Sequence, residues 1–260
     1  LNRPTVDPST RCVRQGYGVL QPRVANSRVG ASASWYARLY SGQVGFDPYT
    51  REISEVYHDI YSQTPFIGKG IYDVRAFEAA VGNRFPDNAI LSHDLIEGLH
   101  ARCGFINDVE LIEDYPSRYL TDARRRHRWV RGDWQLLPWL LPSIRDESGT
   151  KACNPLDFLA HWKMLDNLRR SIWPAGFLLL LALSWLVLPG SPVVWTCVLL
   201  GMILLPWFLQ AILAMALKPS RVTWRYHARF TAHQYMQSLA TDLIQLILLP
   251  YEAYFHLDAI

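Results

Sequence analysis

Residues 92–112 read SHDLIEGLHARCGFINDVELI and join a helix pattern to a strand pattern. After Asp94, four apolar residues recur at the spacing of one helical face: Leu95, Ile96, Leu99 and Cys103. Gly104 marks the expected end of this helix. Residues 105–112 then alternate between apolar and polar side chains, with Val109 and Leu111 on one side of an expected strand. A helix that leads directly into a strand predicts an α/β layer.

Two further helices are expected in residues 1–150. Asp73 is in position to cap a helix that runs through Val81, with Gly82 near its end. The other runs from about residue 117 to Gln135 and carries the densest charge in the chain. Glycine, proline and short apolar runs alternate with charge here, which is typical of a soluble α/β domain.

The composition of the 260 residues excludes several classes of protein. Charged residues are only 19% of the chain, and 10 tryptophans favour a sugar-binding or membrane-interfacial surface. Disorder, a coiled coil and a collagen-like fibre are excluded. The net charge of +3 is too small to indicate nucleic-acid binding by the chain as a whole. The four cysteines show no CxxC spacing, so neither a disulfide scaffold nor a zinc site is expected.

Residues 171–217 contain no Asp, Glu, Lys, Arg or His. The run is interrupted only by Pro189-Gly190-Ser191-Pro192, which predicts a tight turn between two membrane spans, residues 171–188 and 193–217. Each span is close to the roughly 20 residues that a helix needs to cross the hydrocarbon core. A buried helical pair in a globular core is the alternative.

Basic residues flank this hairpin on both outer sides, whereas its turn is uncharged, so both flanks are expected in the cytoplasm. They are Lys163, Arg169 and Arg170 before it and Lys218, Arg221 and Arg225 after it. Residues 151–170 are expected to hold an interfacial amphipathic helix, whose apolar face comprises Phe158, Leu159, Trp162, Leu165 and Leu168. Residues 218–260 are expected to hold a second interfacial helix. They also hold a short uncharged run, residues 243–251, that is either interfacial or the start of a further span.

Two segments of residues 1–150 carry groups suited to chemistry. Asp94 is a carboxylate at a loop-to-helix junction, where the helix dipole favours its ionised form. It can serve as a general base or as an ordinary N-cap. Residues 124–135, RRRHRWVRGDWQ, bring five arginines and two tryptophans together. This pattern fits nucleic-acid binding, a site for a diphosphate and a sugar, or a basic helix on a membrane.

The order of these features resembles the C-terminal half of the catalytic domain in processive inverting glycosyltransferases, such as cellulose and hyaluronan synthases. That class has a Glu-Asp pair whose Asp is the catalytic base, followed by a Gln-x-x-Arg-Trp motif before its membrane helices. Here His93-Asp94 stands at the first motif, and residues 125–129 stand at the second. The departures are His93 in place of Glu and Arg125 in place of Gln.

A closer resemblance is to the glycosyltransferase region of bacterial cyclic β-1,2-glucan synthases, and it covers about residues 10–260. Four runs carry it: GKGIYDV at 68–74, AILSHDLIEG at 89–98, EDYPS at 113–117 and RHRWVRGDWQ at 126–135. It implies a multi-pass protein of the bacterial inner membrane that has a cytoplasmic catalytic domain. It also implies transfer of glucose from UDP-glucose to a β-glucan acceptor.

The resemblance implies a role for each candidate residue. Asp94 would be the catalytic base, Arg125 and Arg128 would bind the donor diphosphate, and Trp129 would hold the acceptor. Lys69 and His93 are further candidates for acceptor contacts.

The resemblance also implies that residues 1–150 form the C-terminal half of a GT-A-like (Rossmann-like) α/β domain, followed by transmembrane and interfacial helices, and it implies a divalent metal, Mg²⁺ or Mn²⁺. No Asp-x-Asp motif occurs in the chain, so the metal ligands and the donor half are expected upstream. The N-terminal sequence LNRPT has no signal-peptide pattern and looks like the cut edge of a longer protein, so this segment alone should be inactive. Remaining domains of that protein and a lipid bilayer are the expected partners, and nucleic acid is not. The alternatives are another processive β-glycan synthase and an inactive membrane scaffold.

Overall fold

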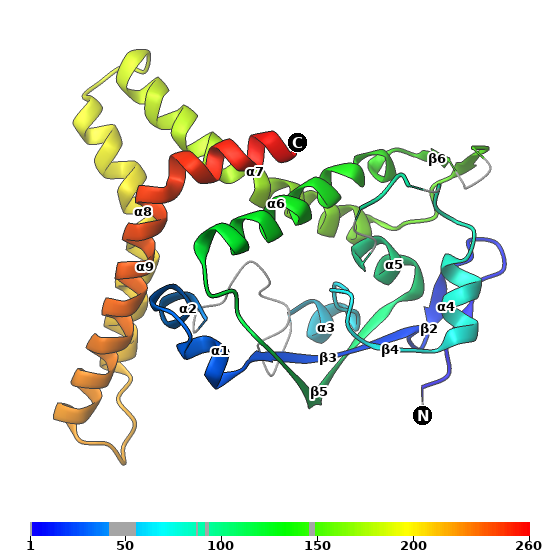
Figure 1. Ribbon diagram of the computed structural model, residues 1–260, viewed down its shortest axis with the longest axis horizontal. Helices are drawn as coiled ribbons and strands as arrows, with labels where there is room; N and C mark the ends of the chain where they lie inside the picture. The colour runs from blue at the N-terminus through cyan, green and yellow to red at the C-terminus, as the bar shows by residue number, and fades with distance from the viewer. Residues whose placement is uncertain (1, 42–55, 87, 92–93, 146–148) are drawn as a thin grey trace. The chain divides into compact units, whose positions relative to one another are not determined.

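The computed structural model describes residues 2–41, 56–86, 88–91, 94–145 and 149–260 (Figure 1). The contacts within the chain divide it into two compact units. The first comprises Leu1–Ser171 with Ala259–Ile260, and the second comprises Ile172–Asp258.

A three-stranded sheet lies at the centre of the first unit. Its strand order is β4 (Ile71–Tyr72), β3 (Val19–Asn26) and β5 (Cys103–Glu113). Strand β3 pairs with β5 in parallel and with β4 antiparallel. Two small hairpins complete the strands: β1 (Thr5–Val6) with β2 (Val13–Gln15), and β6 (Ser143–Arg145) with β7 (Lys151–Cys153). The predicted mixture of helices and strands is confirmed, and the GT-A-like arrangement stays a prediction.

The expected helices of the first unit are present. Helix α4 (Val74–Val81) begins after Asp73, whose Oδ1 accepts a hydrogen bond from the Ala76 N–H at 3.0 Å. Helix α6 (Tyr119–Gln135) begins two residues later than expected. Three short helices, α1 (Arg28–Ser32), α2 (Trp35–Tyr40) and α3 (Val56–Tyr61), were not expected from the sequence.

Helix α5 (Asp94–Ala101) begins at the expected residue but ends before Gly104. Arg102 takes the left-handed turn after it, with φ at 53°, and Cys103 already belongs to β5. Val109 and Leu111 lie in β5 as expected, yet both are more than 40% exposed. The pairing with β3 passes from Ile106 directly to Glu110, so Val109 lies inside the register shift and the regular alternation is interrupted there.

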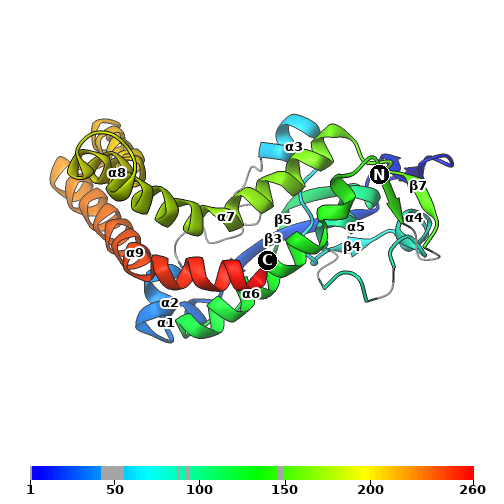
Figure 2. The ribbon, with the colours of Figure 1, turned by 90° about the horizontal axis from the view of Figure 1, so that it is seen from above.

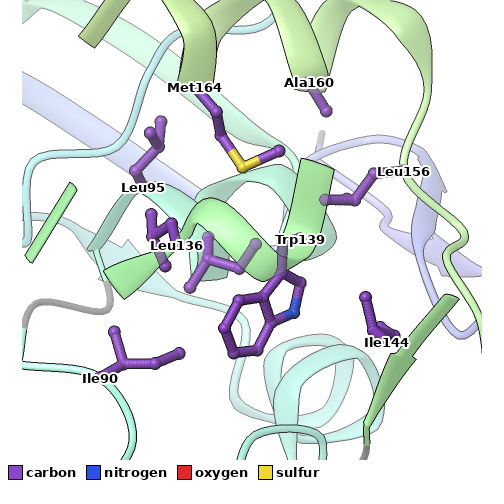
Figure 3. Close-up of a cluster of buried hydrophobic side chains, with 9 residues drawn as sticks. Ile90, Leu95, Leu136, Trp139, Ile144, Leu156, Ala160 and Met164 are labelled. Atoms are coloured by element: carbon purple, nitrogen blue, oxygen red, sulfur yellow. The ribbon is translucent and has the colours of Figure 1, made fainter. Parts of the chain in front are cut away.

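The largest buried cluster holds α5 in place (Figure 3). It joins side chains from α5 and the segment before it, from the turn after α6, from β6, and from α7 and the segment before it: Ile90, Leu95, Ile96, Leu136, Trp139, Ile144, Leu156, Ala160 and Met164. Burying one such large side chain stabilises the fold by about 1.5–3 kcal/mol. The helix that starts with Asp94 is therefore anchored on rigid packing.

Helix α7 (Phe158–Leu186) is one continuous helix where the sequence suggested an interfacial helix followed by a separate span. Its buried side carries Ala160, Met164 and Leu168, four residues apart. Phe158 is 83% exposed and Trp162 is 52% exposed. The prediction that Leu168 shares a face with them is wrong, because the spacing of one helical turn places it with the buried residues.

The second unit contains the rest of α7, α8 (Pro192–Ala216) and α9 (Trp224–Ala259). The predicted turn is present, and across it the Trp185 Nε1–H donates to the Thr196 Oγ1 at 2.9 Å. In the described part of the chain, α8 alone is long and apolar enough to cross a membrane, with a mean hydropathy of 2.2. The span at residues 171–188 stays a prediction, as does the division of the chain at residues 150, 170 and 217. Helix α9 continues without a break through residues 243–251.

Candidate active site

The carboxylate of Asp94 lies against the backbone of Gly68. Asp94 is the first residue of α5 and is half-buried. Gly68 has φ at +82°, and a Cβ added to it would lie 2.8 Å from Cγ, Oδ1 and Oδ2 of Asp94. Only glycine combines this backbone conformation with such a close approach. The GKG segment thus forms one wall of the site around the candidate base.

Aromatic and acidic groups lie near this carboxylate. Burial, and then the charges of Glu97 and Asp94, raise the pKa of the Tyr72 hydroxyl. The Tyr72 ring makes edge-on contacts with Phe66 and Phe77. The charge of Asp94 therefore acts on an aromatic side chain of β4 that packs against two phenylalanine rings.

Lys69 joins the same wall to the edge of the sheet. Its Nζ lies 2.5 Å from Oε2 of Glu113, the last residue of β5. Glu113 pairs with Asn26 of β3, so this is the carboxyl edge of two parallel strands. Ligands bind at this edge in open α/β sheets. The ion pair is partly exposed and contributes at most about 1 kcal/mol to the stability of the fold. Stability alone therefore gives little reason for a lysine at position 69.

Helix α6 carries Arg125 and Trp129 next to each other. The Cζ atom of Arg125 lies 4.7 Å from the centre of the Trp129 ring and 5.9 Å from that of Tyr115. Its Nη2 donates to Asp122 Oδ1 at 2.8 Å. A cation held over an aromatic ring in this way is a preorganised site for an anion beside a flat apolar surface.

Arg128 follows Arg125 by three residues, so the two side chains are neighbours on the surface of α6. Arg128 is exposed, as is Arg124 one turn earlier. Gln135, two turns after Arg128 and hence on nearly the same face, accepts the N–H of Leu91 at 2.6 Å. Leu91 lies three residues before Asp94, so this hydrogen bond ties the C-terminal end of α6 to the segment that leads into α5.

The end of α6 is fixed on α7. The Asn167 Nδ2 donates to Asp133 Oδ1 at 3.1 Å, and the Trp134 Nε1–H donates to Ser171 Oγ at 2.9 Å. Burial raises the pKa of Asp133 to about 6, against the opposing effects of Asn167 and Arg170. Helices α5 and α6 thus both rest on the N-terminal half of α7.

The structure connects the predicted site residues in pairs. Asp94 meets the loop that holds Lys69, and Arg125 meets Trp129. The Leu91–Gln135 hydrogen bond ties the end of α6 to the segment before α5. His93 lies outside the described residues, so its predicted acceptor contact stays a prediction.

Among the described residues, no three His, Cys, Asp or Glu side chains come together as a metal site. The divalent metal that the resemblance implies therefore has no fitting ligand set in this part of the structure. The proposed role of each residue therefore does not depend on that metal.

Two residues of this region were not anticipated from the sequence. Asp122 pairs with both Arg125 and Arg126, and the Tyr36 hydroxyl donates to it at 3.0 Å. The signal for Asp122 was available, because an acidic residue three and four positions before arginines favours such pairs on a helix. Tyr36 had no such signal, since it comes from a distant segment.

Comparison with curated proteins decides the relationship. The chain is 38% identical over its whole length to "Cyclic beta-(1,2)-glucan synthase NdvB" of Rhizobium meliloti (strain 1021). The chain is homologous to a segment of a cyclic β-(1,2)-glucan synthase. This confirms the resemblance carried by the four sequence runs. No family model matches the chain.

The match covers 100% of this chain but only 9% of the Rhizobium synthase. The activity of a whole synthase, its substrates and its partners are therefore matters for the proposal below.

Proposed function

We propose that this chain is the acceptor-side half of an inverting glucosyltransferase, which transfers glucose from UDP-glucose to a growing β-1,2-glucan. The homology to a cyclic β-(1,2)-glucan synthase supports the reaction class. The observation that carries the assignment of the site is the Asp94 carboxylate, held against Gly68 at the start of a rigidly packed helix.

The proposed reaction is a single displacement at C1 of the glucose. The 2-hydroxyl oxygen of the acceptor forms the new bond to C1 as the bond from C1 to the diphosphate oxygen breaks. Asp94 takes the proton of the attacking hydroxyl, and UDP leaves with the bonding electron pair. A well-placed base contributes ~10²–10⁴-fold to such a step. An α-linked donor gives a β-linked product, because the attack comes from the opposite face.

Both arginines of the motif serve the donor diphosphate in this proposal. Arg128 is exposed, so its guanidinium is available to the departing diphosphate. Arg125 contributes charge from its place over Trp129, whose ring offers a flat surface to the acceptor glucose. Lys69, at the carboxyl edge of the sheet, is the remaining proposed acceptor contact.

The membrane is the second part of the proposal. Helix α8 meets the length and composition of a span, and the second half of α7 is proposed as the other arm of a hairpin. We place both flanks of this hairpin, and the catalytic unit, on the cytoplasmic side of the bacterial inner membrane. The exposed Phe158 and Trp162 of α7 suit contact with the membrane surface.

The test is UDP release by the full-length protein in membranes or detergent. We expect UDP from UDP-glucose and not from UDP-N-acetylglucosamine or UDP-glucuronate, with 1,2-linkages in the product. Linkage analysis that gives 1,4-bonds would replace the proposal with a cellulose-like synthase. If no donor yielded UDP, the alternative of a catalytically inactive membrane scaffold would replace the proposal.

Replacing Arg128 with Lys should lower kcat/KM for UDP-glucose about tenfold, because Lys keeps the charge but loses the two-pronged contact with a diphosphate. Arg125→Lys should have an effect of similar size. Steady-state UDP release measures both. Arg145→Lys, at an exposed position in β6, is the control and should behave as wild type. Wild-type kinetics in both motif variants would remove these arginines from the donor site.

A further inference from the structure

Asp122 connects three side chains at the start of α6. Its Oδ1 accepts from Arg125 Nη2 at 2.8 Å, and its Oδ2 accepts from Arg126 Nε and from the Tyr36 hydroxyl, both at 3.0 Å. The Asp122 side chain is only 6% exposed. A buried carboxylate with this many donors is fixed in position.

Two of these donors hold Asp122 independently of Arg125. Arg126 is itself buried and faces the same carboxylate from the next turn. Tyr36 comes from α2, which lies beside the start of α6 in both views (Figures 1 and 2). Burial, and then the charge of Asp122, raise the pKa of Tyr36, so its hydroxyl remains a neutral donor.

Arg125 is held by two neighbours on α6, and its side chain remains 33% exposed. Asp122 binds its Nη2, and the ring of Trp129 lies 4.7 Å from its Cζ. In the described part of the chain its buried Nε has no hydrogen-bond partner. A guanidinium held in this way loses little conformational freedom when it binds an anion.

A half-buried guanidinium needs a counter-ion. Asp122 supplies that counter-ion to Arg125, whose side chain lies in part at the surface.

We propose that Asp122 is a positioning residue that holds Arg125 over Trp129 for binding of the donor diphosphate. Tyr36 and Arg126 fix Asp122 in turn. This inference rests on the proposed function and deepens it, because it names the residue that holds Arg125 in position.

A double-mutant cycle in the full-length enzyme tests it. Asp122→Asn should raise the KM for UDP-glucose about tenfold in the wild-type background. In the Arg125→Gln background, the same change should raise KM less than about twofold, because the residue it positions is gone. The pH dependence of kcat should stay as in wild type, since Asp94 is untouched. An equal increase of KM in both backgrounds would show a merely structural role and overturn the proposal.

A second variant covers the case in which Asp122→Asn does not fold, because Arg126 loses its counter-ion. Tyr36→Phe removes one hydrogen bond to Asp122 and no charge. We expect KM for UDP-glucose to rise about threefold, with the thermal midpoint close to that of wild type, and no rise in the Arg125→Gln background. An unchanged KM in Tyr36→Phe would contradict the proposed chain of contacts. A wild-type enzyme that releases no UDP from UDP-glucose would instead overturn the proposed function itself.

Discussion

Replacing Asp94 with Asn in the full-length enzyme should lower turnover by at least ~10²–10⁴-fold. The amide keeps the size of the side chain but cannot take the proton from the attacking hydroxyl. UDP-glucose affinity should stay within a few-fold, because Asp94 acts on the acceptor. Rates of UDP release and a binding measurement with UDP-glucose separate the two effects.

A purely structural role for Asp94 predicts the opposite pattern. Asn serves about as well as Asp at a helix start, so the free energy of unfolding would change by about 1 kcal/mol or less, with activity kept. Glu97→Gln is the control, because Glu97 lies in the same first turn of α5 and should matter less. Near-normal glucan synthesis by purified Asp94→Asn enzyme would remove Asp94 as the base.

The second large effect is expected from Gly68→Ala. The new Cβ would lie 2.8 Å from the Asp94 carboxylate atoms, which is closer than two such groups can approach. The end of a side chain moves more easily than the backbone, so the carboxylate should shift and the fold should survive. A displacement of about 1 Å in an active site can cost about 10²-fold in rate, and we expect a loss of that order.

Gly149→Ala is a matched control for the backbone. Gly149 has nearly the same conformation, with φ at +79°, and a Cβ there meets nothing within 4 Å among the described residues. Both variants should lose about 1 kcal/mol of stability from the left-handed conformation. Only Gly68→Ala should lose turnover. If the two variants kept the same activity, the contact of Gly68 with the base would have no catalytic importance.

Local signals in the sequence predicted much of the first unit. The cap at Asp73, the apolar face that follows Asp94 and the dense charge before Gln135 each located a helix within a few residues. A helix cap and an apolar helix face each involve residues only a few positions apart in the sequence, so their spacing alone is enough to recognise them.

Contacts between distant segments could not be predicted in this way. The parallel pairing of β3 with β5 joins residues about eighty positions apart, and no local pattern marks β3 as the partner. The error at Leu168 has a similar origin, because α7 has apolar residues on two sides and the sequence does not say which side meets the core.

The same limit applied to the candidate site. Asp94, Arg125, Arg128, Trp129 and Lys69 were identified by motif. The approach of Gly68 to Asp94 and of Tyr36 to Asp122 required the fold. Close approaches of this kind are set by tertiary packing, which places a loop residue against a helix start and α2 against α6.

The central claim is inverting glucosyl transfer at a site that contains this chain. The most direct measurement is NMR of the glucan made by the purified full-length enzyme from UDP-glucose with labelled glucose. The account predicts that each newly added glucose has the β configuration at C1 and is joined to a 2-hydroxyl, with one UDP released per glucose added. Newly added glucose in the α configuration would contradict it.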